Sequence, residues 1–224
     1  MAEPFITESD NGLIEDYGWN EPKTHAHNYL LGDLINILTK FEIPKTAQIL
    51  DAGCGGGYMI HELYGKGYEN IWGFDASKSG IEVSQNSFPE IKDRFRIHDA
   101  YENLLPDSFP DRNYDLVISV EVIEHLYSPK KYLENINRWL KLGGYLVITT
   151  PYHGYLKNLA ISLINGFDFH FNPLWQGGHV KFFSKDTICK ILGDTNFEPV
   201  DFTGSGRLPY LWKSMVIVAK KVGD

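Results

Sequence analysis

Cysteine is scarce in this chain. Cys54 and Cys189 are the two cysteines among 224 residues. Two cysteines make no disulfide framework, and the absence of a Cys-x-x-Cys pair argues against a zinc site. We therefore expect a reducing, cytoplasmic compartment. The N-terminal stretch MAEPFITESDNGLIEDYGW supports this expectation, because it is acidic and lacks the apolar segment of a secretory signal peptide.

Long apolar runs and an excess of basic residues are also missing. No stretch of about 18 apolar residues occurs, so the sequence predicts no transmembrane segment. Lys and Arg number 21 against 29 Asp and Glu, which gives a net charge of -8. Nucleic-acid binding relies on cationic side chains that neutralise phosphates, so this balance argues against nucleic acid as a partner. The length suits a single domain, which we place over residues 1–224.

Strand-like and helix-like segments alternate along the chain. Apolar runs that predict strands lie at 47–52, 70–77, 94–100, 114–122 and 145–151, and amphipathic runs that predict helices lie at 25–41, 59–67, 78–88, 129–144 and 184–197. Two final strands, at 198–206 and 214–221, can pair as a hairpin. The alternation indicates an α/β fold with a parallel sheet and helices on both faces. Such sheets bind ligands outside the carboxyl ends of their strands.

A glycine-rich turn, LDAGCGGGY, follows the first predicted strand and places Asp51 just before Gly53 and Gly55. Glycine permits positive φ and lets a ligand approach the backbone, and the helix that follows offers free N–H groups. The dinucleotide fingerprint G-x-G-x-x-G fails, because Tyr58 occupies its last glycine position. This departure disfavours a nicotinamide-dependent oxidoreductase. A tight turn without any ligand is the alternative for the glycines alone.

Two acids end the next two predicted strands. Asp75 lies 22 residues after Gly53, and Asp99 ends the strand that follows. A carboxylate at Asp75 can accept hydrogen bonds from a ribose diol, and one at Asp99 can accept from an adenine amino group. Either acid alone could instead cap a helix or lie in a solvated loop. In register on successive strands, they favour an adenosine-containing cofactor without a pyrophosphate.

At this point the sequence resembles the class I S-adenosylmethionine-dependent methyltransferases. The segments ILDAGCGGGY, GFDAS, HDA, YDLVISVEVIEHL, LKLGGYLVITTP and SMVIVAKK carry the resemblance, in the family's order, over roughly residues 25–220. It implies a Rossmann-like seven-stranded sheet, mostly parallel with an antiparallel last strand. The segments EVIEHL and GGHVKFFSKDTI are similar to those of the ubiquinone-biosynthesis O-methyltransferases. Similar segments also occur in methyltransferases of uncertain substrate, including ones thought to act on glycans.

The resemblance also implies S-adenosylmethionine as the cofactor and a set of residues that contact it. Asp51 would organise the glycine turn and face the cofactor's amino group, and Asp75 would bind the ribose hydroxyls. The remaining members of the implied set are Gly53 and Gly55 at the methionine part, Ala76 beside Asp75, Asp99 and Ala100 at the adenine, and Val120 below the cofactor. No arginine lies on the N-terminal helix to bind the cofactor carboxylate, which leaves His27 as a weak candidate.

The stretch EVIEH holds the catalytic candidates Glu121, Glu124 and His125, which on one helical turn would share a face. Three hypotheses remain open for them. They bind a divalent ion such as Mg²⁺, as the ubiquinone-type resemblance implies; or His125 is a general base oriented by a glutamate; or the three groups are structural. Mg²⁺ prefers oxygen ligands, so one histidine is not ideal for it. His179 is a second candidate base.

An aromatic insert at about 152–183 follows the fifth predicted strand and is longer than a usual connection. We expect it to fold over the pocket as a lid that sandwiches a flat acceptor, or to pack into the core. Peripheral membrane contact is the minority alternative, because the amphipathic YLKNLAISLINGF carries a single lysine and interfacial helices usually carry several.

These observations converge on one prediction. Residues 1–40 form an arm and a helix, and the domain binds S-adenosylmethionine and methylates a small-molecule acceptor, most readily at oxygen. A sugar or glycan precursor is the alternative acceptor. The rival classes are a nicotinamide-dependent oxidoreductase and a non-catalytic cofactor-binding module.

Overall fold

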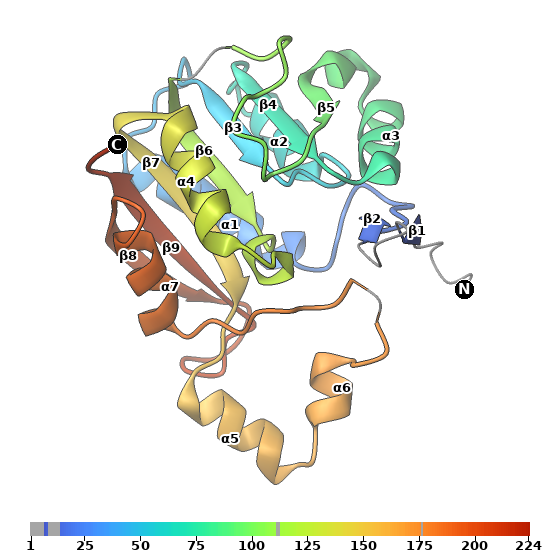
Figure 1. The fold of residues 1–224 in the computed structure, drawn as a ribbon, viewed down its shortest axis with the longest axis vertical. Helices are drawn as coiled ribbons and strands as arrows, with labels where there is room; N and C mark the ends of the chain where they lie inside the picture. Colours follow the sequence, from blue (N-terminus) through green and yellow to red (C-terminus); the bar gives the residue numbers. More distant parts are fainter. Residues whose placement is uncertain (1–6, 9–13, 111–112, 176) are drawn as a thin grey trace.

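The computed structural model describes residues 7–8, 14–110, 113–175 and 177–224 (Figure 1). Its main sheet has seven strands in the order β5-β4-β3-β6-β7-β9-β8. These strands are β3 (Ile49–Ala52), β4 (Ile71–Asp75), β5 (Phe95–Ile97), β6 (Tyr114–Val120), β7 (Leu140–Pro151), β8 (Phe197–Ser205) and β9 (Ser214–Lys221). Strand β9 runs antiparallel to both of its neighbours, β7 and β8. The other neighbouring pairs are parallel, namely β5 with β4, β4 with β3, β3 with β6 and β6 with β7. The predicted fold class and the C-terminal hairpin are confirmed.

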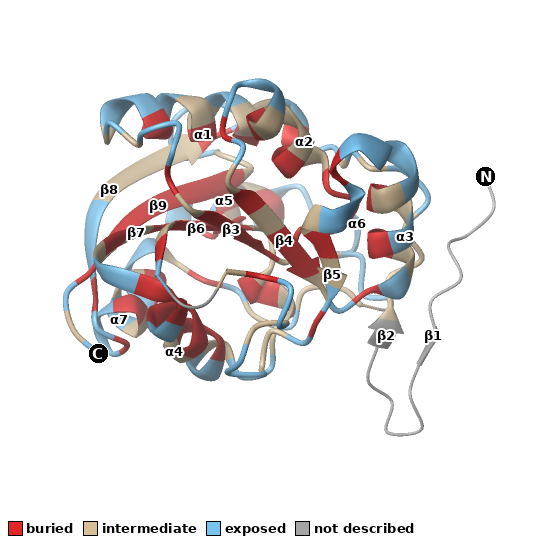
Figure 2. Cartoon of the chain, turned by 90° about the horizontal axis from the view of Figure 1, so that it is seen from above, coloured by how far each residue is buried: buried red, intermediate tan, exposed pale blue. Residues whose placement is uncertain are grey.

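Helices cover both faces of the sheet (Figure 2). One face carries α1 (His27–Lys40), α2 (Tyr58–Gly65) and α3 (Lys78–Ser87), and the other carries α4 (Pro129–Trp139) and α7 (Lys185–Gly193). Side chains of β9 alternate between the two cores: Val216 and Val218 face one, and Met215 and Ile217 face the other. The near-continuous apolar runs of the central strands follow from burial on both sides.

The structure shortens two predicted helices, and the one predicted over 184–197 ends at Gly193, before β8 begins at Phe197. The predicted helix over 129–144 ends at Trp139, and β7 begins directly at Leu140, whose φ/ψ of -80°/147° is extended. The residues between Leu140 and Tyr145 form a register shift between β6 and β7, and Gly143 adopts a φ of +80° within it. The paired glycines therefore do not end the helix but bend the start of the next strand.

Two peripheral segments complete the fold (Figure 1). The short strands β1 (Thr7–Glu8) and β2 (Ile14–Asp16) pair antiparallel in the N-terminal arm. Beyond β7, the insert forms α5 (Tyr155–Leu163) and α6 (Phe167–Phe171), which project from the body of the domain. The two remaining elements are the 3₁₀ turns η1 (Pro89–Arg94) and η2 (Ile123–His125). Arm and insert both lie at the side of the sheet where the parallel strands end.

Candidate active site

Backbone hydrogen bonds hold the glycine turn against β4. The amides of Gly53 and Cys54 both donate to the carbonyl of Phe74, at 2.9 and 2.8 Å, and the amide of Gly55 donates to Oδ2 of Asp75 at 2.8 Å. Gly53 has a φ of +88°, and a Cβ built there would lie 2.5 Å from Cγ2 of Val122. Glycine is required at this position by both conformation and space.

Asp75 ends β4 and has a structural role as well as its predicted one. Its Oδ1 accepts from the amide of Ser77 at 2.8 Å, while Oδ2 accepts from Gly55. Burial raises the pKa of Asp75, and these two hydrogen bonds oppose the rise. Each carboxylate oxygen has a second lone pair, so ribose hydroxyls can still bind. The ribose assignment stays a prediction.

Asp51 lies at the end of β3 and is 2% exposed. Its Oδ1 has no hydrogen-bond partner among the described residues. Burial, with a further contribution from the charge of Asp75, raises the pKa of Asp51 to about 8. A buried acid without a partner is costly, and a bound ammonium group would pair with it, in keeping with the predicted contact to the cofactor's amino group.

The remaining predicted cofactor residues lie at the expected strand ends. Asp99 follows β5 as an exposed residue whose Oδ1 accepts from the amide of Tyr101 at 2.8 Å. Ala100 is partly buried against the core, Ala76 is exposed after β4, and Val120 is the half-buried last residue of β6. Their predicted contacts with the cofactor stay predictions.

His27 is a poor ligand for a carboxylate. Its Nδ1 accepts a hydrogen bond from the amide of Thr24 at 3.0 Å, and its ring stacks on Tyr58. Burial and the nearby Lys23 charge lower the pKa of His27 to about 4. The imidazole is therefore neutral near pH 7 and offers no positive charge.

The N-terminal arm covers the glycine turn, which the sequence pattern did not indicate. A Cβ built on Gly55 would lie 2.4 Å from Cζ2 of Trp19, and one on Gly56 would lie 2.5 Å from the Cα of Pro22. The ring of Tyr17 contacts that of His125 at a centroid distance of 5.7 Å. The arm lacks any apolar periodicity, so Trp19 in an acidic stretch is the one sequence feature that could have indicated its packing on the glycine turn.

Asp16 fastens this arm to the start of α3. Its carboxylate accepts from the hydroxyls of Ser77 and Ser79 and from the amides of Ser79 and Gly18. Burial raises the pKa of Asp16, but the four hydrogen bonds outweigh it and the net pKa is lowered. An anion at a helix N-terminus is also favoured by the helix dipole.

The stretch EVIEH does not form the single helical face that its spacing suggested. Glu121 follows β6 with a φ of +54°, and the turn η2 begins only at Ile123. Oε1 of Glu121 accepts from Oγ1 of Thr149 at 2.8 Å, and Oε2 accepts from Oγ of Ser214 at 3.1 Å. Burial raises the pKa of Glu121 to about 7, against the effect of these hydrogen bonds. Glu121 thus bridges β6, β7 and β9.

Glu124 and His125 instead gather with His179 of the insert. One ligand atom from each of the three lies within 4.8 Å of the others. The carbonyl of Glu124 accepts from the amides of Val180 and Lys181, both at 2.9 Å, which holds the His179 segment in place. Glu124 is 0% exposed, and neither of its carboxylate oxygens has a hydrogen-bond partner in the described part of the chain.

The two histidines of this cluster are neutral bases. Burial lowers the pKa of His125, and burial together with the charge of neighbouring histidines lowers that of His179 to about 4. Nδ1 of His125 lies 2.9 Å from the carbonyl oxygen of Gly177. A carbonyl only accepts, so Nδ1 carries the proton and Nε2 is left with a free lone pair. Burial also raises the pKa of Glu124, and Glu121 adds to the rise.

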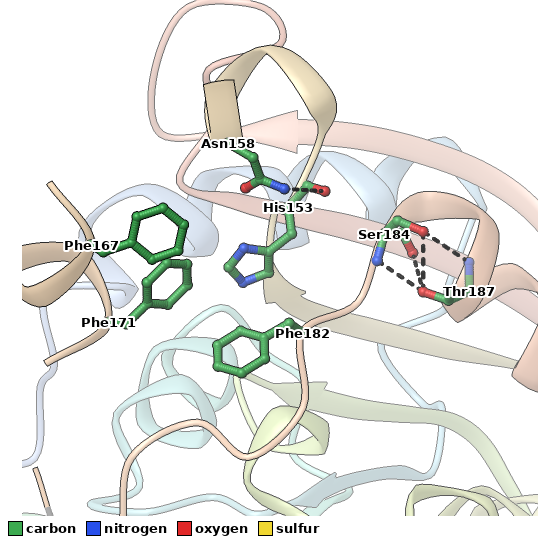
Figure 3. A pocket seen from close by; sticks show the side chains of 7 residues that line it. All are labelled: His153, Asn158, Phe167, Phe171, Phe182, Ser184 and Thr187. Atoms are coloured by element: carbon green, nitrogen blue, oxygen red, sulfur yellow. Dashed lines mark hydrogen bonds between the residues drawn. The ribbon is translucent and has the colours of Figure 1, made fainter. Parts of the chain in front are cut away.

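A cavity of about 260 Å³ lies between the insert and the start of α7 (Figure 3). Phe167 and Phe171 of α6 and Phe182 surround the ring of His153, and Asn158 of α5 completes that wall. Nε2 of His153 and Oδ1 of Asn158 are buried without a hydrogen-bond partner among the residues described. Burial, with the Lys157 charge, lowers the pKa of His153 to about 4. The cavity is therefore mainly aromatic and uncharged at His153, with the polar side chains of Asn158, Ser184 and Thr187 also in its wall.

The outer surface of the insert is apolar. Leu163 and Ile164 are more than three-quarters exposed, and Phe169 is 96% exposed. Within the described ranges, no helix is long and apolar enough to cross a bilayer. The sequence-based expectation of peripheral membrane contact stays a prediction.

Sequence comparisons place these features among known proteins. The profile of a family described as "Methyltransferase domain" matches residues 24–201. The ubiquinone biosynthesis O-methyltransferase of Rickettsia typhi is 30% identical over 157 residues, 70% of this chain and 62% of the relative. That of a Ruegeria species is 30% identical over 172 residues, 74% of this chain and 66% of the relative. The chain therefore spans less than two thirds of these relatives.

Solved structures share the fold. The magnesium protoporphyrin IX methyltransferase of Synechocystis, determined with bound S-adenosylhomocysteine, superposes with a TM-score of 0.65 at 18% identity, over 86% of this chain and 82% of that one. An S-adenosylmethionine-dependent methyltransferase from Clostridium acetobutylicum gives 0.66 at 14% identity, over 86% and 91%.

The buried acid Asp51 predicts a pH-dependent stability. The folded protein retains a proton on Asp51 up to a pKa of about 8, whereas the unfolded chain loses it near the ordinary aspartate pKa of 3.8, so stability falls as pH rises across that window. Asp51→Asn removes this loss. We expect the melting temperature of the variant relative to wild type to rise steadily from pH 5 to pH 8. A difference independent of pH would contradict the assignment.

Mutation of Asp16 tests whether the attachment of the N-terminal arm to α3 closes the site. Asp16→Ala removes four hydrogen bonds, so the segment 16–22 should detach from α3. We expect faster hydrogen exchange in that segment and about tenfold faster release of S-adenosylhomocysteine in stopped-flow measurements. Asp93→Ala, at an exposed acid of η1, is the control. Unchanged exchange and release would show that the arm does not close the site.

Proposed function

Because this chain belongs to the methyltransferase-domain family, we propose that it transfers the methyl group of S-adenosylmethionine to a hydroxyl oxygen of a small-molecule acceptor. The transfer is an in-line displacement at an already activated carbon, so the enzyme chiefly has to align donor and acceptor. An acceptor hydroxyl also has to lose its proton. The chain's own groups for both tasks lie at the ends of β3, β4 and β6.

The observation that carries the proposal is the Glu124–His125–His179 cluster beside the glycine turn. The side chain of Val122 packs against Gly53 and would lie 2.5 Å from a Cβ built there. Val122 directly precedes the turn η2, which holds Glu124 and His125. A hydroxyl placed next to the cofactor at this end of β6 would therefore meet a buried acid and two neutral imidazoles. Such groups accept a proton or bind a cation, and O-methylation needs one of these.

The cluster fits a divalent ion. Glu124 is a fully buried acid that can lose its proton to bind a cation, and Nδ1–H of His125 donates to Gly177, a pattern common among metal-bound histidines. Glu124, His125 and His179 would hold the ion, and a bound ion would lower the pKa of an acceptor hydroxyl. The donors are one carboxylate and two imidazoles, which suit Mn²⁺, Fe²⁺ or Zn²⁺ better than Mg²⁺. Glu121, with both oxygens occupied, is not part of this set.

General-base catalysis is the alternative for the same residues. The lowered pKa of His179 keeps its imidazole unprotonated at neutral pH, so it can accept a hydroxyl proton. Glu124 would then stabilise the imidazolium that forms. Chelation separates the two mechanisms, because a base needs no ion.

The cavity of the insert supports a flat acceptor. Three phenylalanine rings and the imidazole of His153 line it, and the Asn158 amide in the same wall can hydrogen-bond a ring substituent. The relatives named as ubiquinone biosynthesis O-methyltransferases support methyl transfer to oxygen. A sugar precursor, the second acceptor class, would leave the aromatic walls without a stacking partner.

Asp75 tests the cofactor assignment. We expect Asp75→Asn to weaken S-adenosylhomocysteine binding by about tenfold in calorimetry, because an amide cannot accept both ribose hydroxyls and retain the Gly55 and Ser77 contacts. Asp99→Asn, at an exposed residue, should have the smaller effect. Equal affinity of Asp75→Asn and wild type would refute the ribose role.

A labelled-methyl screen tests the reaction. Catechols, quinols and nucleotide sugars are supplied with S-adenosylmethionine, with and without EDTA and with Mn²⁺ or Mg²⁺ restored. We expect a catechol signal that EDTA abolishes and Mn²⁺ restores. Glu124→Gln should lower this turnover by about 100-fold, whereas Glu69→Gln, an exposed control, should not. Full activity in EDTA would assign the cluster to base catalysis, and a nucleotide-sugar signal alone would reject the aromatic acceptor.

A further inference from the structure

Lys157 on α5 carries a buried ammonium group that donates to a single backbone carbonyl in the described part of the chain. It is 4% exposed, and its Nζ donates to the carbonyl oxygen of Lys213 at 3.2 Å, an oxygen that also accepts from the amide of Tyr152 at 3.0 Å. An ammonium group has three N–H donors. No ion pair within 4 Å joins Lys157 to a carboxylate of the described chain. Burial of a charge without such a partner costs several kcal/mol, so the position calls for an explanation.

The ammonium lies beside Glu121, because Lys213, whose carbonyl it binds, directly precedes Ser214, whose hydroxyl donates to Glu121. Its charge acts on Glu121, and it contributes to the lowered pKa values of His153, His170 and His179. Burial lowers the pKa of Lys157 itself to about 8, so it remains mostly protonated near pH 7. The charge of Glu121 acts on Lys157 and raises its pKa, but no Glu121 oxygen forms an ion pair with Nζ within 4 Å, and both oxygens accept from the hydroxyls of Thr149 and Ser214.

Two more cations lie on the β8–β9 side of Lys157. Arg207 is exposed, and its charge contributes to the lowered pKa of Lys157. Lys213 places its Nζ 2.7 Å from Nε2 of His25, which is not an acid. In a protein of net charge -8, Lys157 and Arg207, whose charge acts on it, are two cations without an ion-paired carboxylate among the described residues.

We propose that Lys157 binds an anionic group, a carboxylate or a phosphate, of a molecule in the active site, with Arg207 at the rim. The inference builds on the proposed function, since it places this group on the acceptor next to the Glu124–His125–His179 cluster. The acceptor is favoured because Lys157 belongs to the insert beyond β7, not to the glycine turn after β3. The carboxylate of the cofactor is the other source of the same chemistry.

A purely structural role makes a different prediction. If Lys157 served only to satisfy the carbonyl of Lys213, Lys157→Met would leave that oxygen one donor short and lower the melting temperature. If Lys157 awaits an anion, the methionine side chain fills the same space without a buried charge. The ligand-free variant should then be as stable as wild type or more stable.

The experiment compares wild type, Lys157→Met, Lys157→Arg and the exposed control Lys190→Met by calorimetry and thermal shift, which need no turnover. The probes are S-adenosylhomocysteine alone and, on the protein loaded with it, 3,4-dihydroxybenzoate, its uncharged benzyl-alcohol analogue and inorganic phosphate. We expect Lys157→Met to weaken dihydroxybenzoate binding about tenfold, to leave the alcohol and S-adenosylhomocysteine unchanged, and to abolish stabilisation by phosphate. Lys157→Arg should retain most of the binding.

Each other outcome decides between sources or rejects the site. A tenfold loss of S-adenosylhomocysteine affinity in Lys157→Met, with the alcohol unaffected, would assign the anion to the cofactor. Equal responses of wild type and Lys157→Met to every anionic probe, including no response in either, would overturn the proposal. Failure of the proposed methyl transfer would instead appear as anion binding without any labelled product.

Discussion

Attachment of the glycine turn to β4 is the constraint on which the rest of the site depends. One carbonyl, that of Phe74, accepts from two consecutive amides of the turn, and Asp75 accepts from a third. The positive φ of Gly53 then allows Val122 to pack directly against the turn. Because Val122 is one residue from η2, the same contact sets the position of Glu124 and His125 relative to the cofactor end of the sheet.

Buried acids differ here in whether the protein itself satisfies them. Glu121 accepts hydrogen bonds from one hydroxyl of β7 and one of β9, and these bonds link both strands to the end of β6. Asp51 and Glu124 retain unpaired oxygens at the strand ends, where burial raises their pKa. Unsatisfied buried groups are rare in folded proteins and concentrate where a ligand completes them. Glu121 and Glu124 are therefore close in the sequence but differ in their surroundings. The protein supplies hydroxyl donors to Glu121 and leaves the Glu124 carboxyl group for a ligand.

Two segments outside the parallel α/β core complete the enclosure. The arm covers the glycine turn through Trp19 and Pro22, and Asp16 holds it to α3. The insert brings His179 to Glu124 and buries Lys157 beside Glu121. Burial by these segments lowers the local dielectric and strengthens the electrostatic interactions between the buried groups. It also explains why groups from three distant parts of the chain shift one another's pKa values.

The sequence by itself determined the fold class, the hairpin and the strand-end positions of Asp51, Asp75 and Asp99, because alternating apolar runs and glycine-bounded turns are local signals. Tertiary structure alone decided three other things. It put His179 rather than Glu121 beside Glu124, since the left-handed backbone at Glu121 breaks the helical spacing. It laid the aperiodic arm over the turn through Asp16, and it buried Lys157 near Glu121 but without an ion pair among the described residues. These depend on contacts between residues far apart in the chain, which no local periodicity encodes.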